Sequence, residues 1–155
     1  MNTDKEDLIA KMSRARERLN AALERITPQV EIYPAWKLKQ LLDHLTGWDE
    51  LVASAFRTHA RGENPAVSVK RGGIDQYNAD SVGDRKSMSL EQSRLAYDAA
   101  RAEVIQALRE MPDDKLDQRF RAPWGGMCTV SSVVRIFVSH ELEHAKQIEL
   151  RQAKA

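Results

Sequence analysis

The sequence predicts an all-α protein built as a four-helix bundle, with a long crossover between helices 2 and 3. Four segments carry apolar residues at alternating spacings of three and four, which is the period of an amphipathic helix. No segment alternates apolar and polar residues in the way of a half-buried strand. Since 155 residues is also the length of one ordinary domain, we expect residues 1–155 to form a single domain with almost no strand.

The first predicted helix begins after the capping-box pattern of Thr3 and Glu6 and ends before Pro28. Its apolar stripe consists of Leu8, Met12, Ala15, Leu19, Ala22 and Ile26. The second helix extends from about Trp36 to Phe56, with Pro34 near its start. Its inner side carries Leu38, Leu41, Leu42, Leu45, Trp48, Val52, Ala55 and Phe56. Each of these helices therefore has one apolar face to bury.

The third predicted helix begins after Ser89, which forms a second capping box with Gln92, and it stops at Met111 because Pro112 follows. The fourth starts near Thr129 and continues toward the end of the chain. Their apolar stripes are Tyr97, Val104, Leu108 and Met111 in the third, and Val130, Val133, Val134, Phe137 and Ile148 in the fourth.

Two connections are longer than a simple turn. About thirty residues separate the second and third helices, too many for a tight antiparallel connection. We expect a short helix within this crossover, between Ile74 and Arg85. The connection before the fourth helix ends in Trp124, Gly125 and Gly126, where the glycines permit a sharp entry into the helix.

The composition excludes several classes of partner. There are 24 basic and 23 acidic residues, a net charge of +1, so the chain has no electrostatic footprint for nucleic acid or an acidic membrane surface. No uncharged apolar run reaches the eighteen or so residues of a membrane span. The charged amino terminus does not match a signal peptide, and Cys128 has no second cysteine to pair with. We expect a cytoplasmic protein that binds a small molecule and forms a homodimer through its helix faces.

The stretch HELEH, from His140 to His144, matches the zinc-protease pattern H-E-x-x-H. A protease of this kind also needs a third metal ligand downstream, and only eleven residues follow His144. Gln147 and Leu150 stand where the extended pattern requires glycine and histidine. The sequence therefore argues against a protease.

A third ligand could come from upstream, because His44 falls on the inner arc of the second helix. His140 and His144 fall on the inner arc of the fourth. Three buried imidazoles need hydrogen-bond partners, and one divalent cation would satisfy all three at once. The alternative is that each is an ordinary core histidine bonded to a carbonyl group or water. We expect His59 to lie on the solvated surface and Cys128 to be an inert core residue.

The segments WKLKQLLDHLTGWDE, QYN, PWGG and VSHELEHAKQIELR together resemble the DinB-like superfamily of helical-bundle proteins. The resemblance covers nearly the whole chain, and HLTGWDE and HELEH are its most specific parts. It implies a metal site formed by His44, His140 and His144. It also implies one of two activities: a thiol-dependent transferase, or a self-protection hydrolase of the ClbS/DfsB group, which depends less on a histidine triad.

Three imidazoles leave at least one coordination position for water or substrate, an arrangement typical of a catalytic site. All-nitrogen ligation suits zinc or nickel, and also iron. A low-molecular-weight thiol is the second cofactor that the resemblance implies. We expect Asp49 and Glu141 to support the ligands or to handle protons as catalytic residues, the alternative being charges at the rim of the bundle. We expect Tyr77 and Trp124 to bind substrate at the mouth of the pocket, the alternative being ordinary packing of the crossover against the bundle. The alternatives are a metal-independent binding or self-protection protein, and a dimerising bundle with purely structural histidines.

Overall fold

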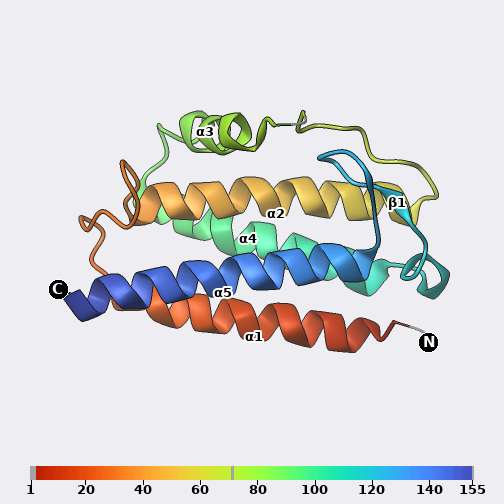
Figure 1. Cartoon of the computed structure of the whole chain (residues 1–155), viewed down its shortest axis with the longest axis horizontal. Helices are drawn as coiled ribbons and strands as arrows, with labels where there is room; N and C mark the ends of the chain where they lie inside the picture. Colours follow the sequence, from red (N-terminus) through yellow and green to blue (C-terminus); the bar gives the residue numbers. More distant parts are fainter. Residues whose placement is uncertain (1–2, 71, 155) are drawn as a thin grey trace.

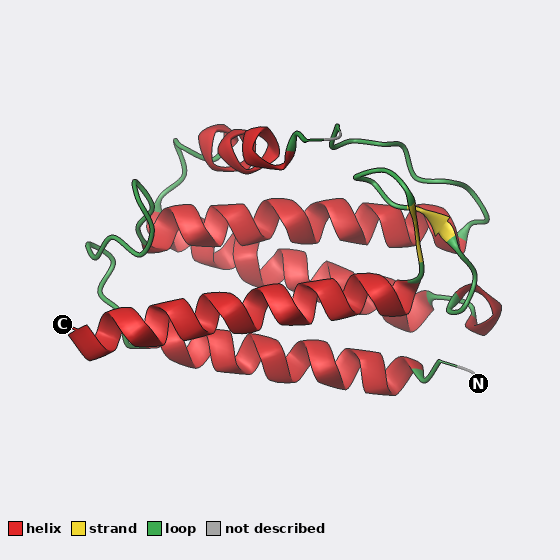
Figure 2. Ribbon diagram, in the orientation of Figure 1, coloured by secondary structure: helices red, strands yellow, loops and turns green. Residues whose placement is uncertain are grey.

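The structure is a computed structural model that describes residues 3–70 and 72–154, and most of these residues are helical (Figures 1 and 2). The helices are α1 (Lys5–Glu24), α2 (Leu38–Ala60), α3 (Ile74–Asp84), α4 (Leu90–Glu110), the 3-10 turn η1 (Asp113–Lys115) and α5 (Val130–Lys154). Two short strands are β1 (Phe120–Arg121) and β2 (Met127–Cys128). The prediction of an all-α fold is confirmed.

Four long helices form the bundle. α2 packs mainly on α4, and α1 packs mainly on α5. Figure 1 shows that α2 and α4 run in the same direction, opposite to α1 and α5, so the chain must return over the outside between α2 and α4. That crossover carries α3, which lies on α2. The prediction of a crossover with a short helix near residues 74–85 is confirmed.

The start of α1 differs from the sequence prediction. The side chain of Asp4, not Thr3, caps the helix by accepting hydrogen bonds from the backbone N–H groups of Glu6 and Asp7, at 3.0 and 3.4 Å. Thr3 is used elsewhere, because its backbone and hydroxyl both donate to the Asp117 carboxylate. By contrast, the predicted capping box of Ser89 and Gln92 is present at the start of α4.

α2 begins two residues later than predicted because a tight turn precedes it. Tyr33 and Trp36 pair as an isolated antiparallel bridge, and Ala35 between them has a positive φ of 67°. Pro34 therefore belongs to this turn rather than to the first turn of a helix. The turn brings the aromatic side chains of Tyr33 and Trp36 beside α2 and α5.

A β-hairpin occupies the connection before α5, where the sequence predicted no strand. Phe120 pairs with Cys128, and both side chains are buried. Gly125 and Gly126 have φ values of 90° and 77°, which glycine adopts without strain, and they form the hairpin turn rather than the entry into α5. The backbone N–H groups of residues 68 and 69 donate to the carbonyl of Pro123, so the hairpin and the crossover are joined.

The apolar core has two parts, one toward each end of the bundle. On α1, α2, α4 and α5 a few polar residues separate the two parts, so the middle of the bundle is a polar layer. We call this set the central layer, and it consists of Arg16, His44, Asp49, Arg101, His140, Glu141 and His144. None of the helices in the described residues is long and apolar enough to cross a membrane.

The prediction that His59 is a surface residue is wrong. Its side chain is buried and stacks on Phe120, with ring centroids 4.1 Å apart. Its Nε2 lies 2.9 Å from the carbonyl oxygen of Lys115. The hairpin and η1 cover this end of α2, and the sequence did not reveal that covering.

α3 is attached to α2 mainly by polar contacts. The hydroxyl of Tyr77 donates to the carbonyl of Gly47 at 2.8 Å, and the indole N–H of Trp48 donates to Asn78 at 2.7 Å. Ser81 is the buried residue of α3, and it packs directly on Gly47. A Cβ atom at Gly47 would lie 2.4 Å from the Ser81 hydroxyl oxygen, so the close approach of the two helices requires a glycine.

We predict that Gly47→Ala detaches or displaces α3. In an ordinary helix this change stabilises by up to about 1 kcal/mol, because glycine is a poor helix former. Here the clash with Ser81 opposes that gain, so we expect faster proteolysis within residues 62–88, with restoration in the double variant Gly47→Ala, Ser81→Gly. Gly83→Ala is the matched control, since its Cβ meets nothing within 4 Å. Equal proteolysis of the Gly47 and Gly83 variants would contradict the prediction.

Candidate metal centre

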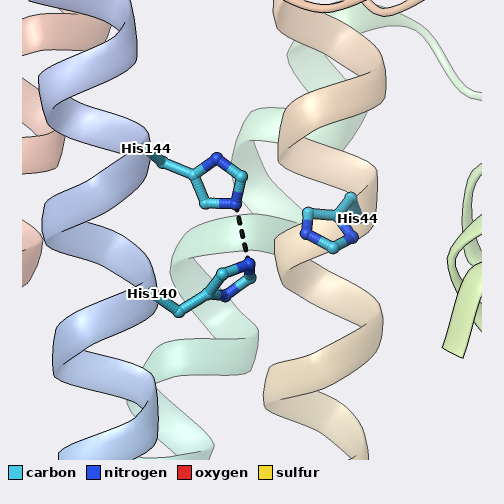
Figure 3. A group of neighbouring side chains, drawn as sticks. All are labelled: His44, His140 and His144. Carbon is cyan, nitrogen blue, oxygen red and sulfur yellow. Dashed lines mark hydrogen bonds between the residues drawn. The ribbon is translucent and has the colours of Figure 1, made fainter.

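Three imidazoles meet in the central layer, between α2 and α5. His44 comes from α2, and His140 and His144 come from adjacent turns of α5 (Figure 3). One ring nitrogen from each lies within 4.8 Å of the others, and the Nε2 atoms of His140 and His144 are 2.9 Å apart. The structure therefore brings together the three residues that the sequence predicted as ligands.

Two aromatic residues from the turn before α2 contact the triad. The Tyr33 hydroxyl lies 2.6 Å from Nδ1 of His144. The Trp36 ring lies against His44, with ring centroids 4.9 Å apart. Sequence reasoning missed both residues, and the signal was slight: an aromatic pair around Pro34, just before a helix that carries an inward histidine.

The donor set fits a divalent metal. Because the Tyr33 hydroxyl occupies Nδ1 of His144, that ring presents Nε2 to the centre. The Nδ1 atom of His44 is buried and has no hydrogen-bond partner. Bonds of about 2.0–2.1 Å to tetrahedral zinc place ligand nitrogens roughly 3.3 Å apart. The Nε2 pair of His140 and His144 would separate by only a few tenths of an ångström to reach that spacing.

Burial favours the neutral form of all three imidazoles, which is the form that binds a metal. Burial and, to a smaller extent, the nearby His140 together lower the pKa of His44 to about 4, while Asn78 acts in the opposite direction. Burial likewise lowers the pKa of His144 to about 3, assisted by His140 and His44. Burial lowers the pKa of His140 as well, while Glu141 and Asp49 act in the opposite direction. Protons therefore compete weakly for these nitrogens near neutral pH.

Two cavities open onto the triad. The first, which we call the polar cavity, has a volume of about 400 Å³ and is reached by all three imidazoles. Its wall includes Tyr33 and Asp75. The second, the apolar cavity, has a volume of about 340 Å³ and is lined mainly by aromatic and aliphatic side chains. The two cavities share His44, His140 and Asn78, so a molecule could extend from one into the other past the histidines.

Comparison with known proteins decides the family. The model of the DinB superfamily matches residues 12–148, which includes all three histidines. The chain belongs to the DinB superfamily. Comparison with curated proteins gives no match.

Solved structures of other proteins share the fold of this DinB-superfamily chain at low sequence identity. The mycothiol-dependent maleylpyruvate isomerase is 13% identical, with a TM-score of 0.76 over 94% of this chain, which spans 61% of the isomerase. The colibactin self-resistance protein ClbS, solved in complex with a dsDNA, is 19% identical with a TM-score of 0.75, covering 94% of this chain and 93% of ClbS. An uncharacterised protein from Escherichia coli UTI89 is 19% identical with a TM-score of 0.77, covering 97% and 92%.

The two carboxylates predicted to handle protons lie behind the triad in a buried ion cluster. Asp49 and Glu141 each contact the guanidinium groups of Arg16 and Arg101, which come from α1 and α4. Arg16 lies 2.9 Å from Asp49 and 2.6 Å from Glu141. All four side chains are less than a tenth exposed, and neither carboxylate lines the two cavities. Burial lowers the pKa of Arg16, but Asp49 and Glu141 outweigh this, so its net shift is upward.

The two predicted substrate-binding residues are placed differently from each other. Trp124, at the hairpin turn, lines the apolar cavity. Tyr77 does not line either cavity, because its ring packs on Trp48 with centroids 4.8 Å apart and its hydroxyl bonds to α2. Tyr77 therefore holds α3 in place over the site.

We predict that Glu141→Gln destabilises the protein by about 3–5 kcal/mol, because it leaves two buried guanidinium groups facing one carboxylate. The measurement is the free energy of unfolding from urea titration. Glu149→Gln is the matched control: its partner Arg18 is half exposed, and ion pairs on the solvent-exposed surface contribute little to stability. The prediction fails if both variants lose the same small amount.

We predict that the metal-free protein loses stability as the pH falls from about 6.5 toward 4. In the unfolded chain His44 and His144 take up protons near their ordinary pKa of 6.5, whereas in the folded protein they stay neutral until about pH 4 and 3. Over this window the unfolded state binds more protons, so acid favours unfolding. The test is thermal unfolding against pH in a chelator. The double variant His44→Asn, His144→Asn should lose less stability over this pH range than the wild type. The same pH dependence in both proteins would refute the assignment of the effect to these two histidines.

Proposed function

We propose that this chain is a metal-dependent enzyme that acts on a small electrophile, as a thiol-dependent S-transferase or as a detoxifying hydrolase. The observation that carries the proposal is the convergence of His44, His140 and His144 at the junction of two cavities. Three neutral nitrogen donors leave coordination positions open, which distinguishes catalytic metal sites from closed structural ones. When bound, the cation would supply Lewis-acid chemistry at those positions.

The proposal gives each nearby residue a task. Tyr33 fixes the tautomer and orientation of His144, as a hydrogen-bonded neighbour does in many metal sites. Trp36 shields one side of His44 from solvent. Asp49 and Glu141, with their two arginines, hold α2 and α5 at the rotation that aims the histidines inward. Their burial away from the cavities favours this positioning role over proton transfer to a substrate.

The proposed metal follows from the type of ligand atom, and the proposed thiol follows from the fold shared with solved structures. All-nitrogen ligation favours zinc or nickel, with iron also suitable. The fold shared with a mycothiol-dependent isomerase supports a low-molecular-weight thiol as co-substrate. The fold shared with the self-resistance protein ClbS over nearly the full length of both chains supports a second candidate, a self-protection protein that acts on its ligand without a metal. The nearly equal numbers of acidic and basic residues favour a small molecule over nucleic acid as the ligand.

We predict that the purified protein binds about one equivalent of zinc or nickel, and that His140→Ala and His144→Ala each abolish this binding. Each change removes one of three ligands, and a cation held by two imidazoles alone dissociates readily. The measurement is metal analysis after dialysis against the chosen ion, together with competition against a chromophoric chelator. Tyr33→Phe should keep the ligands but weaken affinity by about 10–100-fold, since it removes only the support of His144.

His59→Ala is the control, because the His59 side chain is at least as buried as that of His144 but lies away from the triad and its cavities. Wild-type protein that holds less than a tenth of an equivalent after reloading would overturn the metal-dependent proposal and leave the metal-independent candidate. Thiol-dependent transfer and hydrolysis are then separated by assaying the loaded protein on an activated ester and on an epoxide, with and without added thiol.

A further inference from the structure

We infer that the apolar cavity binds a flat, uncharged apolar group of the substrate and that the polar cavity takes the rest of the molecule. The inference concerns the substrate class, and its link to turnover rests on the proposed function. The preference of the apolar cavity for such a group is a property of its walls alone. It can therefore be tested in the absence of metal.

The walls of the apolar cavity come from four separate elements. α2 provides Trp48, α3 provides Ile74, the hairpin turn provides Trp124, and α5 provides Ile136 and Phe137. The two indole rings lie 6.2 Å apart at an interplanar angle of 61°, so they form two adjoining walls rather than a stack. Flat aromatic walls favour flat apolar ligands. A flat, rigid ligand buries a large area against such walls and loses little conformational freedom when it binds.

Among the residues that the structure describes, no Asp, Glu, Lys or Arg side chain lines this cavity. A charged ligand group placed there would lose hydration without gaining a counter-ion, which is strongly unfavourable. The polar cavity differs, because Asp75 lies in its wall. The uncharged polar part of a substrate is therefore directed to the polar cavity, where Asp75 and the three imidazoles offer hydrogen-bond partners.

The rim of the apolar cavity is exposed to an unusual degree. Ile74 and Ile136 are each 52% exposed, although both line the same concave site from different helices. Isolated exposed isoleucines are common, but two that border one hollow form a continuous apolar surface suited to a ligand. A bound apolar group would cover both side chains.

Asn78 contributes the polar contact that both cavities share. Its side-chain oxygen accepts the Trp48 indole N–H at 2.7 Å, so the orientation of the amide is fixed and its NH₂ group is the part offered to a ligand. A carbonyl or hydroxyl group at the junction of the flat group and the polar part would meet this donor next to His44 and His140. The substrate class is accordingly a small molecule in which a neutral aromatic or similarly flat group adjoins a polar reacting group.

The test measures binding of three matched probes to metal-free protein by isothermal titration calorimetry: 2-naphthalenemethanol, 2-naphthoate and 2-naphthylmethylammonium. We expect the neutral probe to bind at least tenfold more tightly than either charged probe. Ile136→Asp should weaken binding of the neutral probe at least tenfold, because the change places a carboxylate at the rim of the apolar cavity. Leu95→Asp is the matched control, since Leu95 is 65% exposed on α4 and lines neither cavity, and it should change binding less than twofold.

Equal binding of the three probes, or equal effects of the Ile136 and Leu95 changes, would overturn the inference. If Ile136→Asp folds poorly, Trp124→Ala provides a second variant. Its affinity for the neutral probe should also fall at least tenfold. His144→Ala separates this inference from the proposed function, because His144 lines only the polar cavity. That variant should lose metal and keep the neutral probe. Wild type that binds metal but no probe would refute the inference alone, and wild type that binds the probe but no metal would refute the proposed function alone.

Discussion

The buried ion cluster of Arg16, Asp49, Arg101 and Glu141 is the constraint on which the arrangement of the bundle depends. Each of the four long helices contributes one charge, and each charge contacts both opposite charges. A helix that slid or rotated by one residue would leave a buried charge unpaired, at a penalty of several kcal/mol. Apolar packing at the two ends of the bundle tolerates small shifts far better. The cluster therefore specifies helix register, although exchanging it for apolar residues need not reduce stability.

Fixed register matters because the candidate site belongs to the same layer. Glu141 directly follows His140, and Asp49 lies five residues after His44, so the ion cluster determines where these histidines point. The four charged side chains and the three imidazoles occupy different parts of the central layer. The charges come from all four long helices, whereas the imidazoles lie between α2 and α5 (Figure 3). The cavities beside the imidazoles are lined in part by α3, the hairpin turn and the turn before α2. The charges on one side of the layer pair with one another, so the other side can keep uncharged imidazoles whose nitrogen lone pairs are available to a ligand.

The periodicity of apolar residues made the helices and the histidine triad predictable. The segments that surround the triad have no such periodicity, so most of their contacts could not be predicted. His44, His140 and His144 each lie on the inward face of a long amphipathic helix, so helical periodicity correctly predicts that they point into the bundle. Arg16 and Arg101 lie on the same arcs, but an arginine in an amphipathic helix is usually solvated, and only the partner helix reveals a buried pair. Tyr33 and Trp36 act from a four-residue turn, and His59 is buried by distant segments. Such contacts depend on tertiary packing, which local pattern does not encode.

The same distinction separates the general chemistry of the site from its specificity. The triad rests on two rigid helices that packing and charge pairing hold in place. The apolar cavity takes its remaining walls from a helix held on α2 by Gly47 and a few hydrogen bonds, and from a hairpin turn at Trp124. Segments of this kind accept substitution and insertion more readily than a bundle core. The layer that holds the histidines can therefore stay constant while α3 and the hairpin vary, and under the proposed function substrate choice would follow those two segments rather than the histidines.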